Sequence, residues 1–440
     1  MAEPRKMGGA RAGPEGGPDV LVAGGGLAAL CAAIAARRAG ASVWLVDAAP
    51  DALKGGNARH GRNIRVAHDG PSAFIPDRYP VPAFEDDLRR ADPGADPDLV
   101  QRLARDSESV PGWLAAQGVA FQPLASGVLP YSRRTVFLLG GGTALVNALV
   151  RTATTLGVRV LHGTAVDDVA ADGRAILRRA EGRTEVSARA VIACTGGFQA
   201  NRPWLREVFG PVAEAFVNRG TPSADGRLLR ALLERGAAPV GDPAHAHLVA
   251  VDARAPADDG GIVTRADGMA WGLVLDRDGR PVRDATHETG SARYSGWGRL
   301  VAGCPGGIAH VILDTAGVAR LGRRVYVPRT MPDTAALAQD LGLDPVRLAE
   351  TLHQEGPAGG PPWHVLSLRP GITFTGLGVR VDADGRVLDR AGAPLPGLFA
   401  AGMIMAPAVL GGRYLSGTAL TVCAVFGRRA GEAAARHALA

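Results

Sequence analysis

The chain has 440 residues, more than one ordinary hydrophobic core holds, which predicts two domains. Its apolar share of 46% supports complete folding, and its net charge of +6 comes from dispersed arginines without a dense basic tract, which argues against nucleic-acid binding. A modest positive field of this kind would still attract anionic substrates towards a cleft.

Four widely spaced cysteines indicate the compartment. Because Cys31, Cys194, Cys304 and Cys423 form no C-x-x-C pair and no metal-ligand spacing, we expect buried thiols in a reducing cytoplasm and no bound metal. The absence of a long apolar run predicts no transmembrane segment. Residues 1–18 are rich in Gly, Pro and Arg and lack the apolar segment of a signal peptide, so we expect a disordered tail.

Residues 20–47 have the pattern of one β-α-β unit. Val20 to Ala23 is a short apolar strand, Gly24 to Gly26 a turn, and Leu27 to Arg38 a helix whose N-terminus would hold a dinucleotide pyrophosphate on unpaired N–H groups. Asp47 closes the second strand, where a carboxylate accepts ribose hydroxyls and repels a 2′-phosphate. This pattern favours FAD or NAD over NADP.

The next segments alternate between glycine-rich turns, helices and strands. A second glycine-rich turn, at 140–143, opens a helix and leads on into further strands. The segments are a cationic loop on the surface or facing a cofactor at 55–65, two helices within 84–117, a helix at 144–156, strands at 158–161 and 187–193, and a loop at 194–198.

From about Asn201 the pattern changes to mixed short elements, which indicates an inserted domain. Strands resume near the C-terminus and end in a long Ala-rich helix. In chain order we expect a helix at 224–236, the His245-Ala246-His247 segment, a hairpin at 276–279, a helical segment at 333–354, a Gly/Pro linker at 355–362, strands at 372–381 and 397–401 around a turn at 384–385, and a helix at 417–439.

Several motifs together resemble the flavoprotein superfamily of fumarate reductases, succinate dehydrogenases and 3-ketosteroid dehydrogenases, and within it the tricarballylate dehydrogenase group. The likeness extends from about residue 19 to residue 437. The motifs that carry it are GGNARHGRN at 55–63, GGGTALVNAL at 140–149, ACTGGFQAN at 193–201, VNRGTPSADG at 217–226, VDARAPADDGGIVTR at 251–265, RYSGWGRLVA at 293–302, RPGITFTGLGV at 369–379, VLGGRYLSG from residue 409 and FGRRAG up to residue 431.

The resemblance implies an α/β fold with a discontinuous, Rossmann-like FAD-binding domain and an inserted α+β capping domain for the substrate. After the tail, the FAD-binding domain would comprise 19–205 and 346–440, and the capping domain 206–345. Asn57 falls where membrane-complex members attach FAD covalently through a histidine, so we expect non-covalent FAD.

The resemblance also assigns residues to the cofactor. Gly24, Gly26, Asp47, Gly56, Asn57 and Val166 would hold the adenosine and pyrophosphate, with Gly196 and Gly197 close by. Gly402 and residues 415–417 would lie beside the flavin, where the helix that begins at Ser416-Gly417 directs N–H groups outward. An ordinary amphipathic helix is the alternative there. The candidates are Gly24, Gly26, Leu27, Ala28, Asp47, Gly56, Asn57, Arg62, Asn63, Val166, Thr195, Gly196 and Gly197, followed by Gly402, Leu415 and Ser416.

Oxidising a CH–CH bond beside a carbonyl or carboxylate needs a hydride acceptor, a base for the α-proton, and cations or donors that stabilise enolate-like charge. FAD would supply the first. The candidates for the other roles are His247, Tyr414, Glu288, Arg293, Arg413 and Arg219.

The resemblance gives three of these candidates a role. His247 falls where fumarate reductases place a substrate-binding histidine, although a histidine beside a strand is often structural. Tyr414 stands in place of their substrate-clamping arginine, and in place of a tyrosine that helps to enolise the ketone in ketosteroid enzymes; packing on the flavin edge is the alternative. Glu288 replaces their proton-delivering arginine, which leaves it as a candidate base with Arg293 as ion-pair partner, or as an idle solvated acid.

Other residues suggest how this chain departs from the family. Arg62, Arg65 and Arg413 are candidates for a polyanion pocket, with surface solvation as the alternative. Met403 stands where the family usually has a glutamate on the ribityl chain, and Arg413 replaces a small residue beside the flavin. The short 355–362 segment predicts a missing lid and access for larger or carrier-bound substrates.

The first interpretation is an FAD-dependent dehydrogenase that forms C=C in a small carboxylate or carbonyl compound and passes electrons to a quinone, an electron-transfer protein or oxygen. An ene-reductase resembling fumarate reductase is the alternative, and it needs an external donor because the chain has no haem C-x-x-C-H motif. A third interpretation, motivated by Met403 and Arg413, is a degenerate FAD-binding scaffold or sensor. The sequence leaves open the substrate, the direction, the electron acceptor and the oligomeric state.

Overall fold

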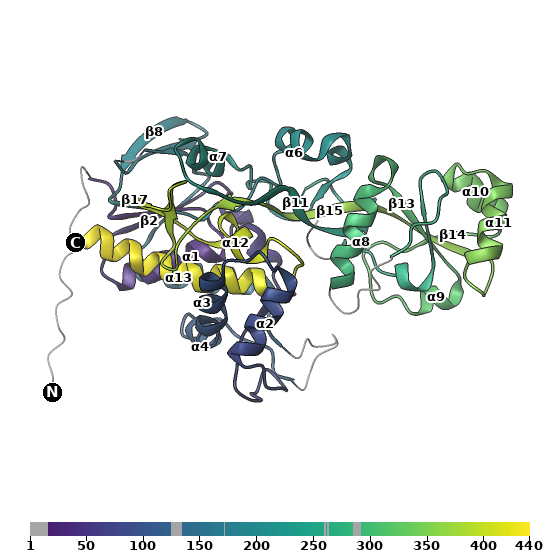
Figure 1. The fold of residues 1–440 in the computed structure, drawn as a ribbon, viewed down its shortest axis with the longest axis horizontal. Coiled ribbons are helices and arrows are strands. Elements are labelled where there is room, and N and C mark those ends of the chain that lie inside the picture. Colours follow the sequence, from purple (N-terminus) through teal and green to yellow (C-terminus); the bar gives the residue numbers. More distant parts are fainter. Residues whose placement is uncertain (1–15, 125–133, 171, 259–260, 262–263, 285–291) are drawn as a thin grey trace. The chain divides into compact units, whose positions relative to one another are not determined.

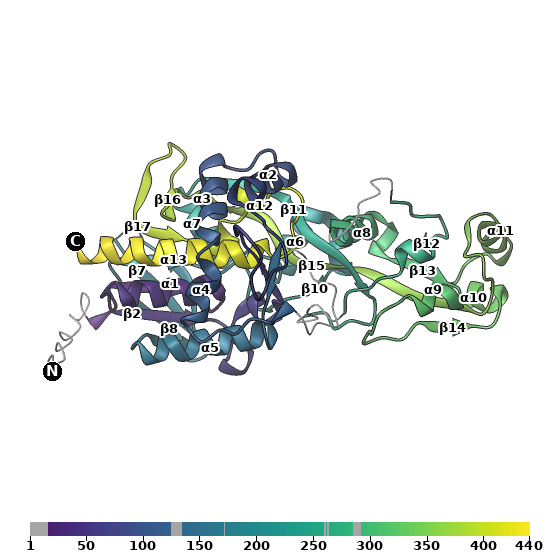
Figure 2. The same ribbon diagram turned by 90° about the horizontal axis from the view of Figure 1, so that it is seen from below.

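The computed structural model describes residues 16–124, 134–170, 172–258, 261, 264–284 and 292–440 (Figures 1 and 2). Their contacts form two compact units. The first comprises Met1–Gly197, Ser223–Asp242 and Gly376–Ala440, and the second comprises Phe198–Pro222 and Pro243–Thr375. The domain boundaries expected at 205/206 and 345/346 stay predictions, and the tail expected at 1–18 falls almost entirely outside the described residues.

A six-stranded sheet forms the centre of the first unit. Five strands run parallel, and the edge strand β16 pairs antiparallel with β17. The apolar runs of β1 and β9 are buried along their whole length, as expected of parallel strands covered on both faces. In spatial order the strands are β16 (Arg386–Leu388), β17 (Pro394–Ala400), β9 (Ala190–Ala193), β1 (Val20–Ala23), β2 (Val43–Asp47) and β5 (Arg159–His162).

Helices α1 (Leu27–Arg38) and α13 (Thr418–Leu439) lie side by side in this unit (Figures 1 and 2). Two glycines of α13 make the close approach possible: a Cβ on Gly427 would lie 2.5 Å from the carbonyl oxygen of Ala28, and one on Gly431 would lie 2.3 Å from that of Ala32. The FGRRAG motif therefore places the C-terminal helix against the helix that follows the first glycine turn.

Other elements of the first unit surround this sheet. The strands β6, β7 and β8 form an antiparallel sheet of their own, and β3 pairs with β4. These elements are β3 (Asn63–Arg65), α2 (Val81–Ala91), α3 (Pro97–Ser107), α4 (Val110–Ala115), β4 (Thr135–Phe137), α5 (Gly141–Thr155), β6 (Ala165–Val169), β7 (Arg174–Arg179), β8 (Gly182–Ser187), α7 (Arg227–Glu234) and α12 (Pro407–Leu410), with the 3-10 turns η2 (Asp51–Leu53), η3 (Gly56–His60) and η8 (Gly402–Ile404).

The second unit is arranged around residues 363–375 of the long strand β15 (Trp363–Val379), whose last residues, like the first residues of β11, belong to the first unit. Strand β15 pairs with β10, β11, β13 and β14, while β12 pairs with β13. Helices α8, α10 and α11 contribute buried side chains to the hydrophobic clusters of the second unit. The remaining elements are α6 (Arg202–Phe209), β10 (Val217–Asn218), β11 (Pro239–Asp252), β12 (Leu273–Asp276), α8 (Ala292–Gly303), β13 (Ala309–Leu313), α9 (Thr315–Ala319), β14 (Arg329–Met331), α10 (Thr334–Leu341) and α11 (Pro345–Glu355).

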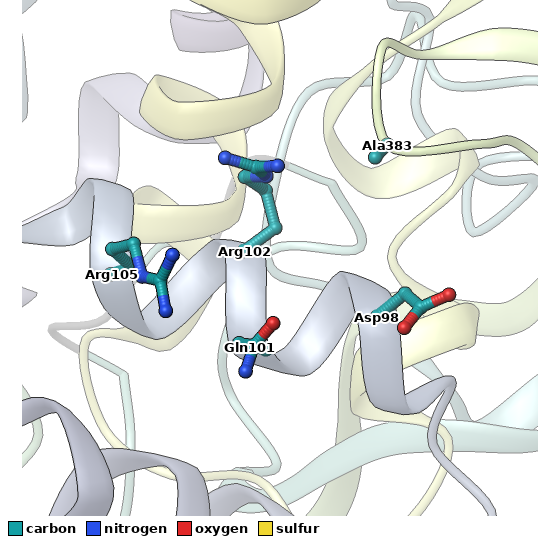
Figure 3. A pocket seen from close by; sticks show the side chains of 5 residues that line it. All are labelled: Asp98, Gln101, Arg102, Arg105 and Ala383. Atoms are coloured by element: carbon teal, nitrogen blue, oxygen red, sulfur yellow. The ribbon is translucent and has the colours of Figure 1, made fainter.

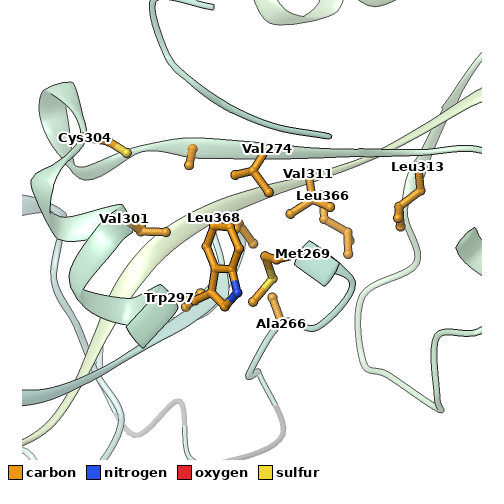
Figure 4. Close-up of a cluster of buried hydrophobic side chains, with 12 residues drawn as sticks. Ala266, Met269, Val274, Trp297, Val301, Cys304, Val311, Leu313, Leu366 and Leu368 are labelled. Atoms are coloured by element: carbon orange, nitrogen blue, oxygen red, sulfur yellow. The ribbon is translucent and has the colours of Figure 1, made fainter. Parts of the chain in front are cut away.

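Two hydrophobic clusters support the second unit. In one, Trp297 of α8 and Met269 pack with Val311 and Leu366 from neighbouring strands (Figure 4). In the other, apolar side chains of α10 and α11 pack with Ile312 of β13 and with β15. Successive side chains of a strand point to opposite faces of the sheet, so Val311 joins one cluster and Ile312 the other. The two clusters give this unit a core of its own.

Some sequence-based boundaries are corrected. The segment 84–117 contains three helices, since Asp96 caps a new helix by accepting hydrogen bonds from the N–H groups of Asp98 and Leu99. The helical segment 333–354 is divided at Gly342, which ends α10 with a φ of +65°. The strand expected at 187–193 is the end of β8 followed by β9. The β7–β8 hairpin was not expected, because β8 is mostly exposed and polar and the apolar run of β7, Ala175 to Leu177, is short and flanked by arginines.

Two further expectations concern the whole chain. All four cysteines are buried free thiols, as predicted. Within the described ranges, no helix is both long enough and apolar enough to cross a membrane.

Candidate functional site

The turn from β1 into α1 is shaped by glycines. Gly24 has a φ of +119°, and a Cβ there would lie 2.5 Å from the carbonyl oxygen of Cys194, which follows the neighbouring strand β9. A Cβ on Gly26, the N-cap of α1, would meet nothing nearer than 3.8 Å, the carbonyl oxygen of Gly55. The N-terminus of α1 therefore faces open space bordered by backbone, which is the arrangement that binds a pyrophosphate.

A second glycine turn faces the first. Gly56 has a φ of +52°, and its Cβ position lies 3.6 Å from the Cα of Gly26. Asn57 follows within η3. Leu27 and Ala28 are buried in the first turn of α1, so at this position they offer backbone N–H groups and no exposed side chain.

Asp47 ends β2 beside these turns. Its Oδ1 accepts a hydrogen bond of 3.1 Å from the N–H of Ala49, whereas its buried Oδ2 has no partner. A Cβ on Gly25 would lie 1.9 Å from that Oδ2, so a glycine is required below the carboxylate. Burial raises the pKa of the Asp47 carboxyl, although backbone N–H groups and His162 oppose that rise. An unpartnered buried oxygen fits the acceptor of a ribose hydroxyl.

The loop after β9 borders the same edge of the sheet. The Oγ1 of Thr195 is buried without a partner, and Gly196 has a φ of +76°. Gly197 follows as the last residue of this segment in the first unit. Val166, on β6, is buried. Since carboxyl ends of parallel strands meet at one edge, β1, β2 and β9 bring these residues and Asp47 to the same edge.

The N-terminus of α13 provides a second such environment. Gly417 is its N-cap with a φ of +87°, and a Cβ there would lie 2.7 Å from the amide nitrogen of Arg65. The Oγ1 of Thr418 is buried and has no hydrogen-bond partner. The Nδ2 of Asn63 donates to the Oγ of Ser416 over 3.4 Å. The first residue of α13 thus carries a buried hydroxyl with no partner in the protein, at the positive end of the helix.

Arg65 corrects one expectation. Its side chain is buried, its Nε donates to the carbonyl oxygen of Ser416 over 3.0 Å, and its Nη1 donates to the hydroxyl of Tyr79 over 3.2 Å. The carboxylate of Asp87 lies 3.6 Å from the same Nη1. Arg65 therefore fixes the start of α13 and does not belong to a polyanion pocket. Arg413 is exposed, and its backbone N–H donates to the carbonyl oxygen of Ala91.

The remaining flavin-side candidates also lie in the first unit. Gly402 opens η8 with a φ of +79°, and its Cβ position lies 2.7 Å from the Cβ of Ala28, so packing against α1 already requires glycine there. Met403 follows it in η8. Arg62 is half-buried, and its carbonyl oxygen accepts from the N–H of Leu138.

Tyr414 is half-buried just before α13. Burial raises the pKa of its phenol, against hydrogen bonds from the backbone N–H groups of Ala419 and Gly417 and the charge of Arg65, which lower it. The phenol is therefore protonated at neutral pH. N–H groups that donate to its oxygen polarise it and make its O–H a stronger donor.

His247 belongs to the second unit, on β11. Its ring is stacked on Phe374, with ring centroids 5.1 Å apart. Burial lowers the pKa of His247 to about 3, and the neighbouring charges of Arg219, His245 and Arg299 act in the same direction. The imidazole is neutral at physiological pH, so it can exchange hydrogen bonds but is a weak base.

Arg219 is buried in the same unit and is held in place by neighbouring oxygens. Its Nε donates to the carbonyl oxygen of Gly261 over 3.1 Å, and its Nη1 donates to the Oγ1 of Thr373 over 2.8 Å. Arg293 lies in α8, and Glu288 lies outside the described residues. The structure thus supports His247 and Arg219 as neighbours and leaves the Glu288–Arg293 pair untested.

A surface hollow of about 240 Å³ also occurs in the first unit. Figure 3 shows that Asp98, Gln101, Arg102 and Arg105 line it from α3, with Ala383 opposite. The Nη1 of Arg102 lies 3.8 Å from the carboxylate of Asp106. The hollow contains none of the predicted site residues, and we assign it no role.

Sequence reasoning missed His162. It ends β5, with its Nδ1 3.9 Å from the Oδ2 of Asp47 and its Nε2 3.3 Å from the Oδ1 of Asp51. The signal was a polar residue at the carboxyl end of a parallel strand adjacent to β2. Detecting it requires the strand order of the sheet, which a single sequence does not provide.

The chain resembles known proteins over nearly its whole length. A family model described as "FAD binding domain" matches residues 19–420. The NADH:fumarate oxidoreductase of Klebsiella pneumoniae (strain 342) is 25% identical over 96% of this chain and 48% of that protein, so the chain spans about half its length. The probable fumarate reductase Ifc3 of Shewanella frigidimarina is 28% identical over 97% of this chain and 76% of that protein.

A solved structure confirms the fold. The 3-ketosteroid-Δ4-(5α)-dehydrogenase of Rhodococcus jostii RHA1, in complex with 4-androstene-3,17-dione, superimposes with a TM-score of 0.71 at 25% identity, covering 95% of this chain and 96% of that chain. The expected α/β fold with a parallel nucleotide-binding sheet is therefore confirmed.

Proposed function

The chain belongs to the FAD-binding family and is an FAD-dependent oxidoreductase, and from this premise we propose that it oxidises a CH–CH bond beside a carbonyl or carboxylate to C=C. When bound, FAD supplies the hydride acceptor for this chemistry. The observation that carries the proposal is the polarised phenol of Tyr414 beside the N-terminus of α13. Because its motifs resemble those of the tricarballylate dehydrogenases, we propose an activity of that kind.

The residues present fit FAD. The open glycine turns at Gly26 and Gly56 would hold the pyrophosphate, and the unpartnered Oδ2 of Asp47 would accept a ribose hydroxyl. Near α13, the buried hydroxyl of Thr418 and the positive end of the helix dipole would stabilise negative charge on a reduced ring system. Leu415 and Ser416 would line this flavin side.

Tyr414 would act as the hydrogen-bond donor to the substrate. A phenol that stays protonated and donates to a carbonyl oxygen makes the adjacent C–H more acidic, because negative charge develops on that oxygen as the proton leaves. A neutral donor favours a carbonyl or thioester-like oxygen over a free carboxylate, which a cation binds better. A neutral tyrosine at this position therefore favours a carbonyl substrate over a carboxylate.

Two residues of the second unit stay proposed substrate ligands. His247, neutral in its buried position, would donate a hydrogen bond to a substrate oxygen, and Arg219 would add positive charge nearby. With a pKa of about 3, His247 is too weak a base for an α-proton at neutral pH. Glu288 remains the proposed base, with Arg293 as its partner.

A second candidate is the reverse reaction, reduction of an activated alkene. It is favoured by the names of the two curated relatives, an NADH:fumarate oxidoreductase and a probable fumarate reductase. In this direction the chain needs an external electron donor, whereas the dehydrogenase needs an acceptor such as a quinone, an electron-transfer protein or oxygen.

Anaerobic spectroscopy of the purified holoprotein separates the two directions. We expect a yellow protein whose flavin absorbance bleaches with a small panel of saturated ketones and di- or tricarboxylic acids, among them tricarballylate. Bleaching by one of them supports the dehydrogenase. Reoxidation of the dithionite-reduced protein by fumarate or an enone, without bleaching by any saturated compound, supports the reductase, and neither response supports an FAD-binding scaffold.

The matched variant is Tyr414→Phe, which keeps the ring and removes the donor. We expect it to bind FAD and to bleach about 100-fold more slowly, the usual effect of removing one positioned donor or acid. Tyr326→Phe makes the same change at a tyrosine outside the predicted site, so it is the control and should bleach at the wild-type rate. Equal bleaching rates in wild type and Tyr414→Phe contradict the proposed donor.

A further inference from the structure

The carboxyl edge of the parallel sheet carries a second polar group beside Asp47. His162 is the last residue of β5, which pairs with β2 in register so that Asp47 lies opposite His162. The sheet therefore brings a carboxylate and an imidazole together from two strands that are more than 100 residues apart in sequence.

The two groups face one another without a hydrogen bond. The Nδ1 of His162 and the Oδ2 of Asp47 are 3.9 Å apart, too far for a direct bond. Both atoms are buried, and neither has any hydrogen-bond partner; the Asp47 side chain is itself 7% exposed. Unpartnered buried polar atoms are costly, so a pair of them facing one gap indicates that a ligand completes the pair.

The position of the proton on the His162 ring determines which groups can bind between His162 and Asp47. Its Nε2 lies 3.3 Å from the Oδ1 of Asp51, which in turn is paired with Lys54 over 2.9 Å. Because Nε2 is within hydrogen-bond distance of Asp51 and Nδ1, at 3.9 Å, is not within that distance of Asp47, the contacts favour the tautomer with the proton on Nε2, which leaves a lone pair on Nδ1. Nδ1 and Oδ2 are then two acceptors, and the group between them must bring two donors.

We propose that His162 is a second ribose ligand of the bound FAD: one hydroxyl of the adenosine ribose donates to Asp47 and the neighbouring hydroxyl donates to Nδ1 of His162. A vicinal diol supplies two O–H donors at adjacent positions, which matches two acceptors about one ribose edge apart. A 2′-phosphate has no such donor and would meet two acceptors. The inference rests on the FAD assignment and is independent of the direction of the reaction.

The test uses adenine nucleotides as competitors of FAD on the apoprotein. FAD binding is followed by quenching of flavin fluorescence, and ADP, 2′-deoxy-ADP and 3′-deoxy-ADP are titrated as displacing ligands. In the wild type we expect each deoxy analogue to bind about tenfold more weakly than ADP, the usual value of a hydrogen bond to a charged or buried acceptor.

The decisive comparison is His162→Phe, which keeps a planar ring and removes the acceptor. We expect the penalty of one deoxy analogue to disappear while the other, on Asp47, persists. FMN, which lacks the adenosine, should bind wild type and variant equally. The same substitution at the exposed His353 of α11 is the matched control and should change none of these affinities.

The possible failures are distinguishable. If both penalties persist in His162→Phe, the second ribose contact is wrong although FAD still binds. If wild-type protein binds neither FAD nor ADP, the cofactor assignment itself fails. If His162→Phe folds poorly by circular dichroism, His162→Leu takes its place: it too removes the Nδ1 acceptor, so one penalty should disappear, and persistence of both overturns the proposal.

Discussion

His247 illustrates how burial changes the role of a single side chain. The motif likeness assigns a substrate-binding histidine, and a histidine in an active site is readily taken for an acid or base. In the structure its pKa is lowered to about 3, mainly by burial, with the charges of Arg219, His245 and Arg299 acting in the same direction. A group with this pKa is neutral over the whole physiological range and contributes a hydrogen bond without charge.

A prediction about pH follows at this residue. His247→Gln should reduce kcat/KM about 10- to 100-fold by removing a substrate contact, and the pH profile between pH 5 and 9 should keep its shape, since His247 does not titrate there. The measurement is kcat/KM as a function of pH for both proteins. Disappearance of a profile limb near pH 6 to 7 in the variant would show that His247 is the titrating base.

The first glycine turn allows a second residue-level prediction. A Cβ on Gly26 would have 3.8 Å of clearance, so Gly26→Val should fold, while its side chain fills the space over the N-terminus of α1. We expect a colourless protein with a wild-type circular dichroism spectrum. By contrast, Gly25→Ala would place its Cβ 1.9 Å from the Oδ2 of Asp47 and should weaken FAD binding by displacing that carboxylate. A yellow Gly26→Val protein is incompatible with the pyrophosphate site.

At the scale of elements, the start of α13 is held by a network from α2 and β3. Arg65 donates to the carbonyl oxygen of Ser416 and to Tyr79, and Tyr79 donates to the carboxylate of Asp87 over 2.7 Å. Arg134 also donates to Asp87. Burial alone raises the pKa of Asp87, but hydrogen bonds from Tyr79 and Arg134 and the charge of Arg65 outweigh it, so that its pKa lies below the ordinary value.

This network predicts an acid-sensitive contribution to stability. A carboxyl with a lowered folded-state pKa stabilises the protein above its unfolded-state pKa of about 4, and the stabilisation is lost as pH falls through the folded value. Asp87→Asn should reduce the free energy of unfolding by about 2–3 kcal/mol at pH 7, with the difference from wild type shrinking below pH 4. Urea unfolding at pH 7, 5 and 3.5 measures this, and a difference that is constant with pH would exclude the carboxylate as its source.

Elements were predictable from the sequence where local signals agreed. The first β-α-β unit and the C-terminal helix were predicted within a residue or two, because an apolar run, a glycine turn and an amphipathic or alanine-rich helix each follow from local preferences. The β7–β8 hairpin and the divided helices at 84–117 and 333–354 were missed. The mostly exposed and polar β8 carries no periodic apolar signal, and the apolar run of β7 is short. Helix ends depend on caps such as Asp96, which an average over a helical segment conceals.

The candidate site shows the same limit more strongly. The glycine turns and Asp47 were identifiable because their spacing in sequence reflects their geometry. The partnership of His162 with Asp47, and of Arg65 with Ser416, depends on strand order and on contacts between residues more than 100 positions apart. Arg65 was expected in a polyanion pocket because of its charge. Its burial, which the charge does not reveal, shows that it is a structural residue instead.

At the scale of the whole molecule, the predicted FAD-binding residues all belong to the first unit. FAD binding should therefore stabilise the first unit selectively. At 100 times its Kd, FAD should add about 2.7 kcal/mol to that unit. Hydrogen exchange followed by mass spectrometry should show slower exchange in peptides from α1, β2 and α13 and little change in peptides from α10 and α11. Equal protection in both units would contradict this assignment.

The order of strands in the first sheet has a consequence for biosynthesis. Strand β9 lies between β1 and β17, yet β17 begins only at Pro394, and α13, which packs on α1, comes later still. A ribosome adding about 5–20 residues per second would release β1, β2 and β9 well before their last neighbours emerge. The nascent chain must then keep two apolar sheet surfaces from aggregating until translation is nearly finished, which makes chaperone dependence during expression a direct outcome of this topology.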